Sequence, residues 1–451
     1  MKFAPLLRSA ALVTAVAILP TATISMAQVD GRAGPEFAKL FATYQQIKRH
    51  YVEPVEDEKL IRGAIDGMLA SLDPHSAYVD GSDLQRLETM IDGNYSGLGL
   101  SVMMDDGAVK VISPFRGSPA EKAGLKAGDY ITHLDGTLIY GGKLDDAVSK
   151  MRGKAGTAIK LTIFRAGRDE PFDVAVTRGV IELEPVTHTV AKGNIGVVTV
   201  NEFSRDVGSD VLGAWEAIQK EATGRVNGLV LDLRSNPGGS LDEAVALSDL
   251  FLDKGRIVSQ RGRARGETLL YDAESMFRGD IATGVPLIVL IDAGSASASE
   301  IVAGALQDHR RALVMGERSF GKGSVQSLLP LGQGRDAALK LTTARYYTPS
   351  GHSVQEGGIK PDIAVPQLSD PDLAKRNKYI MRESDLRGHL VNELGLEDEA
   401  LESDKVDDPR FKLTAEELKE QGVEDFQLHY AMETLRRTTT SSVALNSQKK
   451  K

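Results

Sequence analysis

The spacing of apolar residues changes twice along this chain of 451 residues. Between residues 36 and 90 apolar side chains recur every three or four positions, which predicts two or three amphipathic helices. From residue 93 to about residue 180 apolar and polar positions alternate, as in strands, with short helical stretches between them. Beyond Ile195 continuously apolar strands alternate with helices, so we expect a sheet that is covered on both faces.

These changes divide the chain into segments of ordinary domain size. We expect an α/β multidomain protein with a helical N-terminal region, a β-rich module, an α/β domain and a polar, helical C-terminal region. The residues from Thr438 onward are predicted to form a loose tail. Together with a signal peptide, the predicted boundaries are 1–27, 30–92, 93–180, 181–366 and 367–451.

The first 27 residues have the organisation of a secretory signal peptide. Lys2 and Arg8 precede an apolar run over 10–19, and the sequence Ser-Met-Ala at 25–27 supplies a small-x-small cleavage pattern. The run is about half the ~20 residues that cross a bilayer, so a retained anchor in the inner membrane is the weaker interpretation. We therefore expect a periplasmic or other extracytoplasmic location.

Composition narrows the chemistry that the chain can perform. Removing the signal peptide takes away two positive charges and no negative ones, so the formal net charge changes from −9 to −11, which argues against a nucleic-acid partner. The absence of cysteine excludes disulfides and thiol nucleophiles. His50 and His75 stand alone in the sequence, and we expect neither a metal nor another cofactor.

Three serines occupy alternate positions in the run IDAGSASASE, residues 291–300. The preceding apolar residues predict a strand, a tight turn and a helix, an arrangement that places side chains at the carboxyl end of a sheet, where ligands commonly bind. Ser297 and Glu300 also fit the S-x-x-E capping box, whose role is only to satisfy free backbone N–H groups. Both interpretations place Ser297 at a helix N-terminus, where developing negative charge is stabilised.

A nucleophilic serine needs a base. His309 lies in a charged run and His352 in a Ser-Gly loop, and the chain has no G-x-S-x-G setting that would favour a Ser-His-Asp site. Lys322, between two glycines in GERSFGKGSVQ, is the other candidate, provided that burial or a cationic neighbour lowers its pKa. A solvated turn lysine is the alternative, and a P-loop is not, because its spacing is missing.

The run Gly97-Leu98-Gly99-Leu100 and the later string SPAEKAGLKAGD at 118–129 resemble a PDZ domain. The resemblance implies that a peptide C-terminus adds as a strand while backbone N–H groups of the Gly loop hold its carboxylate. Glycines permit the turn that directs several N–H groups at one anion. GLGL by itself is also compatible with a simple strand start.

The motifs together resemble the carboxyl-terminal processing proteases, the S41 family of Ser-Lys peptidases with a PDZ domain. The resemblance covers residues 93–365 and includes LDLRSNPGGS, GSASASEIVAGALQD, GERSFGKGSVQ and TARYYTPSGHSVQEGGIKPDI in the family's order. It implies a ClpP/crotonase-like α/β serine protease core. In this core Ser297 resembles the nucleophile and Lys322 the general base, and Gln326 resembles the residue that orients the lysine amine.

The sequence NPGG after the strand GLVLDLR resembles the family's oxyanion loop. By that resemblance Gly238 or Gly239 donates one N–H to the oxyanion and Ala298 donates the other. Two glycines after a proline allow a turn open enough for this role, and a plain strand-to-helix turn is the alternative. Ser235 stands where the family often has asparagine.

The resemblance implies a cell-envelope serine endopeptidase that recognises the C-terminal tails of exported or envelope proteins. It further suggests an adaptor protein as a partner, and the helical ends favour a homo-oligomer. Two other classes remain open from the sequence. A non-catalytic periplasmic PDZ chaperone or adaptor would lack the dyad, and an acyl-thioester enzyme on a similar core would have no use for a peptide-binding domain.

Overall fold

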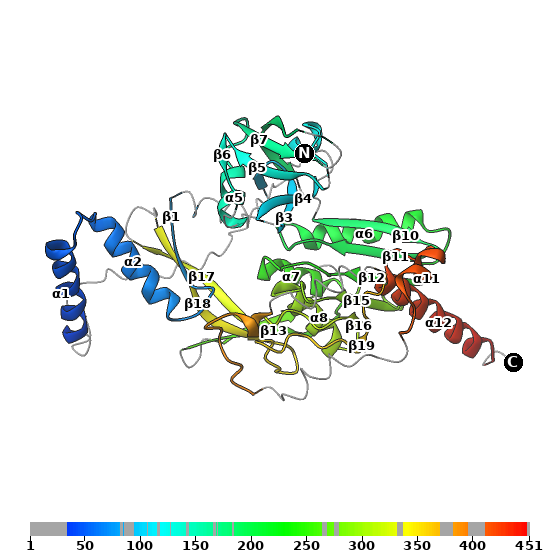
Figure 1. Ribbon diagram of the computed structural model, residues 1–451. Helices are drawn as coiled ribbons and strands as arrows, with labels where there is room; N and C mark the ends of the chain where they lie inside the picture. Colours follow the sequence, from blue (N-terminus) through cyan, green and yellow to red (C-terminus); the bar gives the residue numbers. More distant parts are fainter. Residues whose placement is uncertain are drawn as a thin grey trace, which may run out of the picture. The chain divides into compact units, whose positions relative to one another are not determined.

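The computed structural model describes most of the chain after the predicted signal peptide, which lies outside the described residues (Figure 1). The described residues are 34–81, 84, 94–105, 107–114, 118–126, 128–140, 144–165, 168, 170–182, 185–263, 268–274, 279–331, 337–369, 382–395 and 411–448. Contacts divide the chain into two compact units, Met1–Gly67 and Met68–Lys451. Among the described helices, none combines the length and hydropathy that a membrane span requires.

The first unit contains α1 (Gly34–His50) and most of α2 (Asp57–Ala70), which confirms two of the predicted helices. The end of α1 is fixed to the start of α2 by one carboxylate. Asp57 accepts a hydrogen bond from the Tyr44 hydroxyl at 2.7 Å and pairs with the Lys48 amine at 2.6 Å. Helix α1 buries none of its residues in this unit.

The β-rich module has its own sheet and its own core. Its elements are β2 (Asn94–Gly97), β3 (Leu100–Asp105), β4 (Ala108–Pro114), α4 (Pro119–Lys122), β5 (Tyr130–Leu134), β6 (Thr137–Leu138), α5 (Leu144–Met151), β7 (Ala158–Phe164), β8 (Phe172–Thr177) and β9 (Gly179–Glu182). The antiparallel sheet has the order β3-β4-β5-β7-β8, with β6 beside β5. Because β2 pairs with β9, the module begins and ends at the same two-stranded ribbon.

The α/β domain is built on a six-stranded sheet. Its elements are β10 (Val186–Ala191), β11 (Ile195–Val200), α6 (Val207–Glu221), β12 (Gly228–Asp232), α7 (Leu241–Asp249), β13 (Gly255–Gly262), β14 (Thr268–Ala273), β15 (Leu287–Ile291), α8 (Ala298–Asp308), β16 (Ala312–Gly316), β17 (Ser324–Leu331), β18 (Ala337–Tyr347) and β19 (Ile363–Ala364). The sheet order is β10-β11-β12-β15-β16-β19, and all its strands except β10 run parallel.

Apolar side chains cover both faces of this sheet, as the continuously apolar strands predicted. Alternate residues of one strand enter different cores: Leu229 and Leu231 pack with α6, α7 and α8, whereas Val230 packs with the C-terminal helices. Strands β12 and β15 are buried over their whole length. Burial on two faces explains why these strands show no alternation of apolar and polar residues.

A second sheet of five strands has the order β1-β18-β13-β14, with β17 paired to β18. Its outer strand β1 (Ala77–Asp80) follows α2 in sequence and pairs antiparallel with β18 (Figure 1). The chain that precedes the β-rich module therefore contributes a strand to the sheet that carries the Lys322 loop.

The C-terminal region contains the 3₁₀ turn η2 (Glu383–Asp385) and the helices α11 (Ala415–Glu420) and α12 (Phe426–Gln448). The prediction of a loose tail from Thr438 onward was wrong as far as Gln448, because α12 continues through this segment. Neither glycine nor proline interrupts the sequence there, so nothing in it ends a helix once α12 has started.

Candidate active site

Ser297 occupies the turn between β15 and α8 in an unusual backbone conformation. Its φ is 55° and its ψ is −109°, a combination that non-glycine residues rarely adopt. The hydroxyl makes no capping hydrogen bond to the helix, although the backbone N–H of Ser297 donates to Glu300 Oε2 at 2.7 Å. Ser297 and Glu300 thus occupy the predicted capping-box positions at the start of α8, and the hydrogen bond from the Ser297 N–H to the Glu300 side chain is formed.

The other two serines of this turn bind the loop that follows β12. The Ser295 hydroxyl donates to the Leu233 carbonyl oxygen at 2.8 Å, and the Ser299 hydroxyl donates to the Asn236 carbonyl oxygen at 3.0 Å. Both side chains are fully buried, whereas Ser297 is partly exposed. Two of the three hydroxyls thus join loops, and the middle one is left accessible.

The NPGG loop lies directly against Ser297. A Cβ atom placed on Gly238 would be 2.8 Å from Ser297 Cβ and 3.0 Å from the Ala298 nitrogen, so no other residue fits there. Asp292, which follows β15, accepts from the backbone N–H groups of Ser235 at 2.7 Å and Gly294 at 2.9 Å. This carboxylate fixes the two loops to each other.

The two glycines of the loop differ in how their N–H groups are used. The Gly238 N–H donates to the Asn236 side-chain oxygen at 2.9 Å, and the Gly238 carbonyl accepts from the Phe203 N–H at 2.9 Å. In a trans peptide the N–H points opposite to the carbonyl, so the Gly239 N–H points away from Phe203. Neither Gly239 nor Ala298 donates its N–H to another of the described residues.

A single buried carboxylate connects the Ser297 turn to the Lys322 loop. Besides the Ser297 N–H, Glu300 accepts from the Ser319 hydroxyl at 2.6 Å, the Gly321 N–H at 2.7 Å and the Lys322 N–H at 3.0 Å. Its side chain is fully buried, and this burial raises its pKa to about 7 despite the four hydrogen bonds.

The environment of Lys322 favours the neutral amine. Burial lowers its pKa below the ordinary value, and the nearby ammonium of Lys340 lowers it further. The carboxylates of Glu383, Glu300 and Asp73 act in the opposite direction but do not outweigh these two effects. A lowered pKa is the condition that a lysine must meet to act as a base near neutral pH.

Tyr346, which no pattern in the sequence marks as functional, also lies at this site. The buried Tyr346 hydroxyl donates to the Lys322 carbonyl oxygen and also contacts the Ser297 hydroxyl. Burial raises its pKa well above the usual value, so it remains a neutral donor. Tyr346 lies within the motif TARYYTPSG, yet nothing in that motif distinguishes it from Tyr347 as the residue that faces Ser297.

Gln326 lies on β17 opposite Thr342 of β18, next to an irregularity in the strand register. Its Nε2 donates to the Ser324 hydroxyl at 3.0 Å and to the Thr342 hydroxyl at 3.1 Å. Strand irregularities of this kind often redirect a side chain next to an active site. The predicted contact of Gln326 with the Lys322 amine is not among the hydrogen bonds of the described residues.

The loop at Gly97–Leu100 joins β2 to β3 in the β-rich module. Leu98 is buried in the module's core, and its carbonyl oxygen accepts from the Ala120 N–H at 2.8 Å. Gly99 has a φ of 73°, a conformation that favours glycine. The four predicted residues therefore form one short loop at the start of β3.

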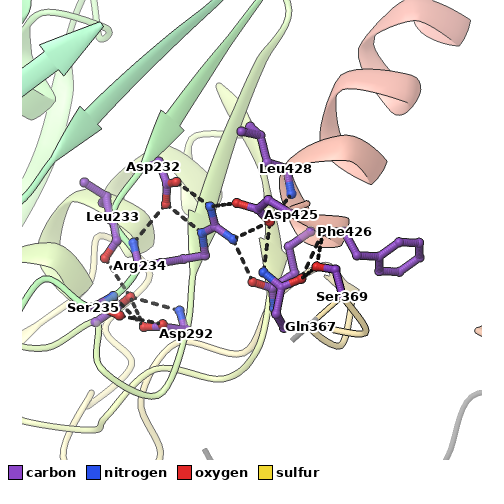
Figure 2. A network of polar contacts seen from close by, with 12 residues as sticks. Asp232, Leu233, Arg234, Ser235, Asp292, Gln367, Ser369, Asp425, Phe426 and Leu428 are labelled. Carbon is purple, nitrogen blue, oxygen red and sulfur yellow. Dashed lines mark hydrogen bonds and ion pairs between the residues drawn. The ribbon is translucent and has the colours of Figure 1, made fainter. Parts of the chain in front are cut away.

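Arg234, which precedes the NPGG loop, connects this loop to the C-terminal region (Figure 2). Its guanidinium binds Asp232 through Nε at 2.8 Å and Nη2 at 2.6 Å, and it binds Asp425 through Nη1 at 3.0 Å and Nη2 at 2.7 Å. Gln367 and Gln427 add further hydrogen bonds to this cluster. The start of α12 is thereby fixed to the segment that leads from β12 into the NPGG loop.

Comparison with known proteins identifies the family. The model of peptidase family S41 matches residues 194–365, that of the PDZ domain matches 96–176, and that of the activating protease CtpB N-terminal domain matches 15–82. The carboxy-terminal-processing protease of Bartonella bacilliformis is 48% identical over 79% of this chain and 80% of its own length. The chain belongs to peptidase family S41.

Two further comparisons agree with this assignment. The carboxy-terminal processing protease CtpA of Bacillus subtilis is 36% identical to this S41 peptidase over 75% of the chain and 70% of the relative. A solved structure of the photosystem II D1 C-terminal processing protease is 30% identical, covers 79% of this chain and 93% of its own, and has a TM-score of 0.50. The predicted family, α/β multidomain fold and serine peptidase class are confirmed.

Proposed function

We propose that this S41 peptidase cleaves exported or envelope proteins near their C-termini, with Ser297 as nucleophile and Lys322 as general base. The observation that carries the proposal is the shared carboxylate of Glu300, which accepts from the backbone N–H groups of both residues. The lowered pKa of Lys322 supports its role, because a base must be neutral before it can accept a proton.

The acylation step transfers one proton through Lys322. The neutral amine accepts the hydroxyl proton of Ser297 while Oγ forms a bond to the scissile carbonyl carbon, and the carbonyl oxygen becomes an oxyanion. The lysine ammonium then donates this proton to the amide nitrogen as the C–N bond breaks, which releases the C-terminal fragment and leaves an acyl-enzyme. In the second step Lys322 accepts a proton from the attacking water as its oxygen bonds to the acyl carbon. It then donates this proton to Ser297 Oγ as the ester C–O bond breaks, which restores the serine hydroxyl.

For the oxyanion we propose the N–H groups of Ala298 and Gly239. Ala298 is the first residue of α8, whose N-terminal dipole also favours negative charge. Gly239 is favoured over Gly238 because the Gly238 N–H donates to Asn236. Gly238 is then required for its lack of a side chain against Ser297.

The PDZ domain is proposed to capture the free C-terminus of the substrate. The loop Gly97–Leu100 at the start of β3 corresponds to the Gly loop that binds the carboxylate in such domains, and the peptide adds to the sheet as a strand. The relatives named carboxy-terminal processing proteases support this substrate class. The basic and apolar N-terminal residues support an extracytoplasmic location.

The test combines cleavage of a quenched fluorescent peptide with labelling by a serine-directed phosphonate, mapped by mass spectrometry. Ser297→Ala should abolish labelling, and both Ser297→Ala and Lys322→Ala should reduce cleavage by at least about 10³-fold. Ser327→Ala and the exposed Lys220→Ala serve as matched controls and should remain active. Near-normal cleavage by Ser297→Ala, or phosphonate attached to another serine, would contradict the proposal.

A second comparison tests the substrate class. The same peptide with an amidated C-terminus lacks the carboxylate that the Gly loop would bind, so its KM should rise by about tenfold, or about 1.4 kcal/mol of lost binding. Equal KM values for the free and amidated peptides would exclude recognition of the C-terminus.

A further inference from the structure

A tight turn at Asp73–Ser76, between α2 and β1, packs against the sheet that carries the Lys322 loop. The Asp73 carboxylate accepts from the His75 N–H at 2.8 Å and from the Ser76 N–H at 2.9 Å, and it also binds the Ser76 hydroxyl at 2.8 Å. Both Asp73 and Ser76 are buried. Burial acts against ionisation of Asp73, but these hydrogen bonds outweigh it and lower its pKa, so the group is a carboxylate.

This turn makes three contacts with Thr342 of β18, the longest of which joins the Ser76 hydroxyl to Thr342 Oγ1 at 3.5 Å. The Thr342 hydroxyl donates to Asp73 Oδ1 at 3.1 Å, and the Thr342 backbone N–H donates to the Ser76 hydroxyl at 3.1 Å. A carboxylate only accepts hydrogen bonds, so the single hydroxyl proton of Thr342 is committed to Asp73. The Thr342 oxygen can therefore only accept from its other neighbours, which are the Gln326 amide at 3.1 Å and the more distant Ser76 hydroxyl at 3.5 Å.

Because the Thr342 oxygen can only accept, it determines the orientation of the Gln326 side-chain amide. Its NH₂ group must face Thr342, and the second proton of this group goes to the Ser324 hydroxyl. The carbonyl end of a planar amide then points the other way, and its oxygen is the atom that can accept a hydrogen bond from a lysine amine. With a donor in place of Asp73, either orientation of the amide would be allowed.

A second path leads from the same turn to the backbone of the lysine loop. The His75 ring binds the Glu383 carboxylate at 2.9 Å, and Glu383 also accepts from the Gln355 amide at 3.0 Å. The Gln355 side-chain oxygen accepts from the N–H of Gly323, the residue after Lys322, at 3.1 Å. Burial opposes ionisation of Glu383, but the hydrogen bonds from His75 and Gln355 lower its pKa.

We propose that Asp73 is a positioning residue for the catalytic lysine, acting through Thr342 on the orientation of Gln326. This inference rests on the proposed Ser297 and Lys322 chemistry and adds a requirement for the turn that follows α2. The charged groups around the lysine amine are Lys340 of β18, Glu300 of α8, Glu383 of η2 and Asp73 itself. A change at Asp73 alters this set, whereas a change at Thr342 does not.

The test uses the full-length enzyme and compares Asp73→Asn, Thr342→Val and Thr342→Ser. Thr342→Val removes the hydroxyl and should lower kcat by about 10- to 100-fold, part of the ~10²–10⁴-fold that a well-placed base contributes, with less than about twofold change in KM. Thr342→Ser keeps the hydroxyl and should restore kcat to within about threefold of the wild type. Thr343→Val is the matched control, because the neighbouring Thr343 hydroxyl binds Ser327 and not this network.

The dependence of kcat on pH distinguishes the loss of the Asp73 charge from the loss of the Thr342 hydroxyl. Asp73→Asn removes a negative charge that raises the pKa of Lys322, so the rising limb of kcat against pH should move to lower pH while the plateau falls. In Thr342→Val the limb should stay in place and only the plateau should fall. A limb that moves in both variants, or in neither, would contradict the assignment.

Two other results would overturn the inference: Thr342→Ser being as impaired as Thr342→Val, or Thr343→Val losing as much kcat as Thr342→Val. Thermal unfolding shows whether each variant is folded. If Ser297→Ala remains active, the proposed function fails. If Ser297→Ala is inactive while Thr342→Val has normal kcat, only the positioning role of Asp73 fails.

Discussion

Glu300 is a residue on which burial and hydrogen bonding act in opposite directions. Four donors from two loops favour its charged form, whereas complete removal from water disfavours that form. Burial dominates and brings the pKa to about 7. The same carboxylate that connects the Ser297 turn to the Lys322 loop therefore carries a cost in stability when it is ionised.

This cost predicts a pH dependence of stability. The pKa of Glu300 is raised from 4.5 to about 7, so between these values the folded protein keeps a proton that the unfolded chain releases. The free energy of unfolding therefore falls as the pH rises through this interval, by ~3 kcal/mol in all, and is level above it. Glu300→Gln lacks the titration, so the stability of the wild type relative to this variant should decrease with pH.

The measurement is urea unfolding of both proteins between about pH 5 and about pH 8. Glu216→Gln, a change at an exposed glutamate of α6, should follow the wild type at every pH. If the wild type instead gains stability over Glu300→Gln as the pH rises, the four hydrogen bonds outweigh burial and the predicted direction is wrong.

Some residues of the site can be found from sequence because their neighbours mark them. Ser297 follows an apolar strand and precedes a helix, and Lys322 stands between glycines, so local patterns made both of them candidates. The choice of these two over a plain helix cap and a solvated turn lysine came from the resemblance to the family. Asp73 and Thr342 are separated by most of the chain, and no local pattern connects them. Their contact exists only because β1 pairs with β18, which is a long-range choice that the periodicity of either strand leaves open.

At the scale of elements, the Arg234 cluster shows how a C-terminal helix can affect the NPGG loop. Arg234 lies between Asp232 at the end of β12 and Asp425 just before α12 (Figure 2). Burial opposes ionisation of Asp425, but Arg234 outweighs it and lowers the pKa of that carboxyl. Asp425 therefore supports the folded state above its unfolded pKa, and this support is lost as the pH falls through the folded value.

Arg234→Lys should loosen the connection between these elements. Lysine keeps the charge but cannot make paired hydrogen bonds to two carboxylates, so we expect a loss of ~1–2 kcal/mol, less than the ~3–5 kcal/mol for removing a buried partner outright. Hydrogen exchange should become faster in α12, and kcat should fall. Arg225→Lys, whose wild-type guanidinium binds the Gly284 carbonyl, is the matched control. Unchanged exchange in α12 would show that Arg234 does not hold this helix.

The bounds of several elements follow from periodicity. Apolar spacing in the sequence predicts helices over Leu144–Met151 and Val207–Glu221, and these coincide with α5 and α6. It also predicts a helix from Leu241 to Leu252, but α7 ends at Asp249, because the apolar residues Leu250, Phe251 and Leu252 stay buried after the helix has ended. Apolar spacing reports burial, and burial continues past the end of a helix.

At the scale of the whole molecule, the PDZ domain has the features of an independent folding unit. Its core includes Val109, Val111, Ile131, Leu161 and Ile163, all without solvent exposure, and it is distinct from the two cores of the α/β sheet. Its first and last strands, β2 and β9, are neighbours in one ribbon. A segment with its own core and adjacent ends can be excised without breaking other strand pairings.

We therefore expect a fragment of residues 94–182 to fold by itself. Circular dichroism should show cooperative thermal unfolding, and the fragment should bind a peptide with a free C-terminus at least about tenfold more tightly than its amide. The same fragment with Ile131→Asp is the control, because a charged residue in the core should leave the fragment unfolded. It tests whether the circular dichroism signal reports a packed core. Lack of cooperative unfolding in the unsubstituted fragment would show that the domain needs the rest of the chain.

The backbone of Ser297 has a consequence for how this enzyme can change. A positive φ is unfavourable for serine by ~1–3 kcal/mol and is acceptable for glycine. Random replacement combined with selection for heat resistance alone should thus enrich glycine at this proposed nucleophile and yield more stable proteins without the proposed activity. Serine would be kept at this position only if the variants were also selected for peptide cleavage. At residue 297 thermal stability and the proposed catalytic activity therefore favour different amino acids.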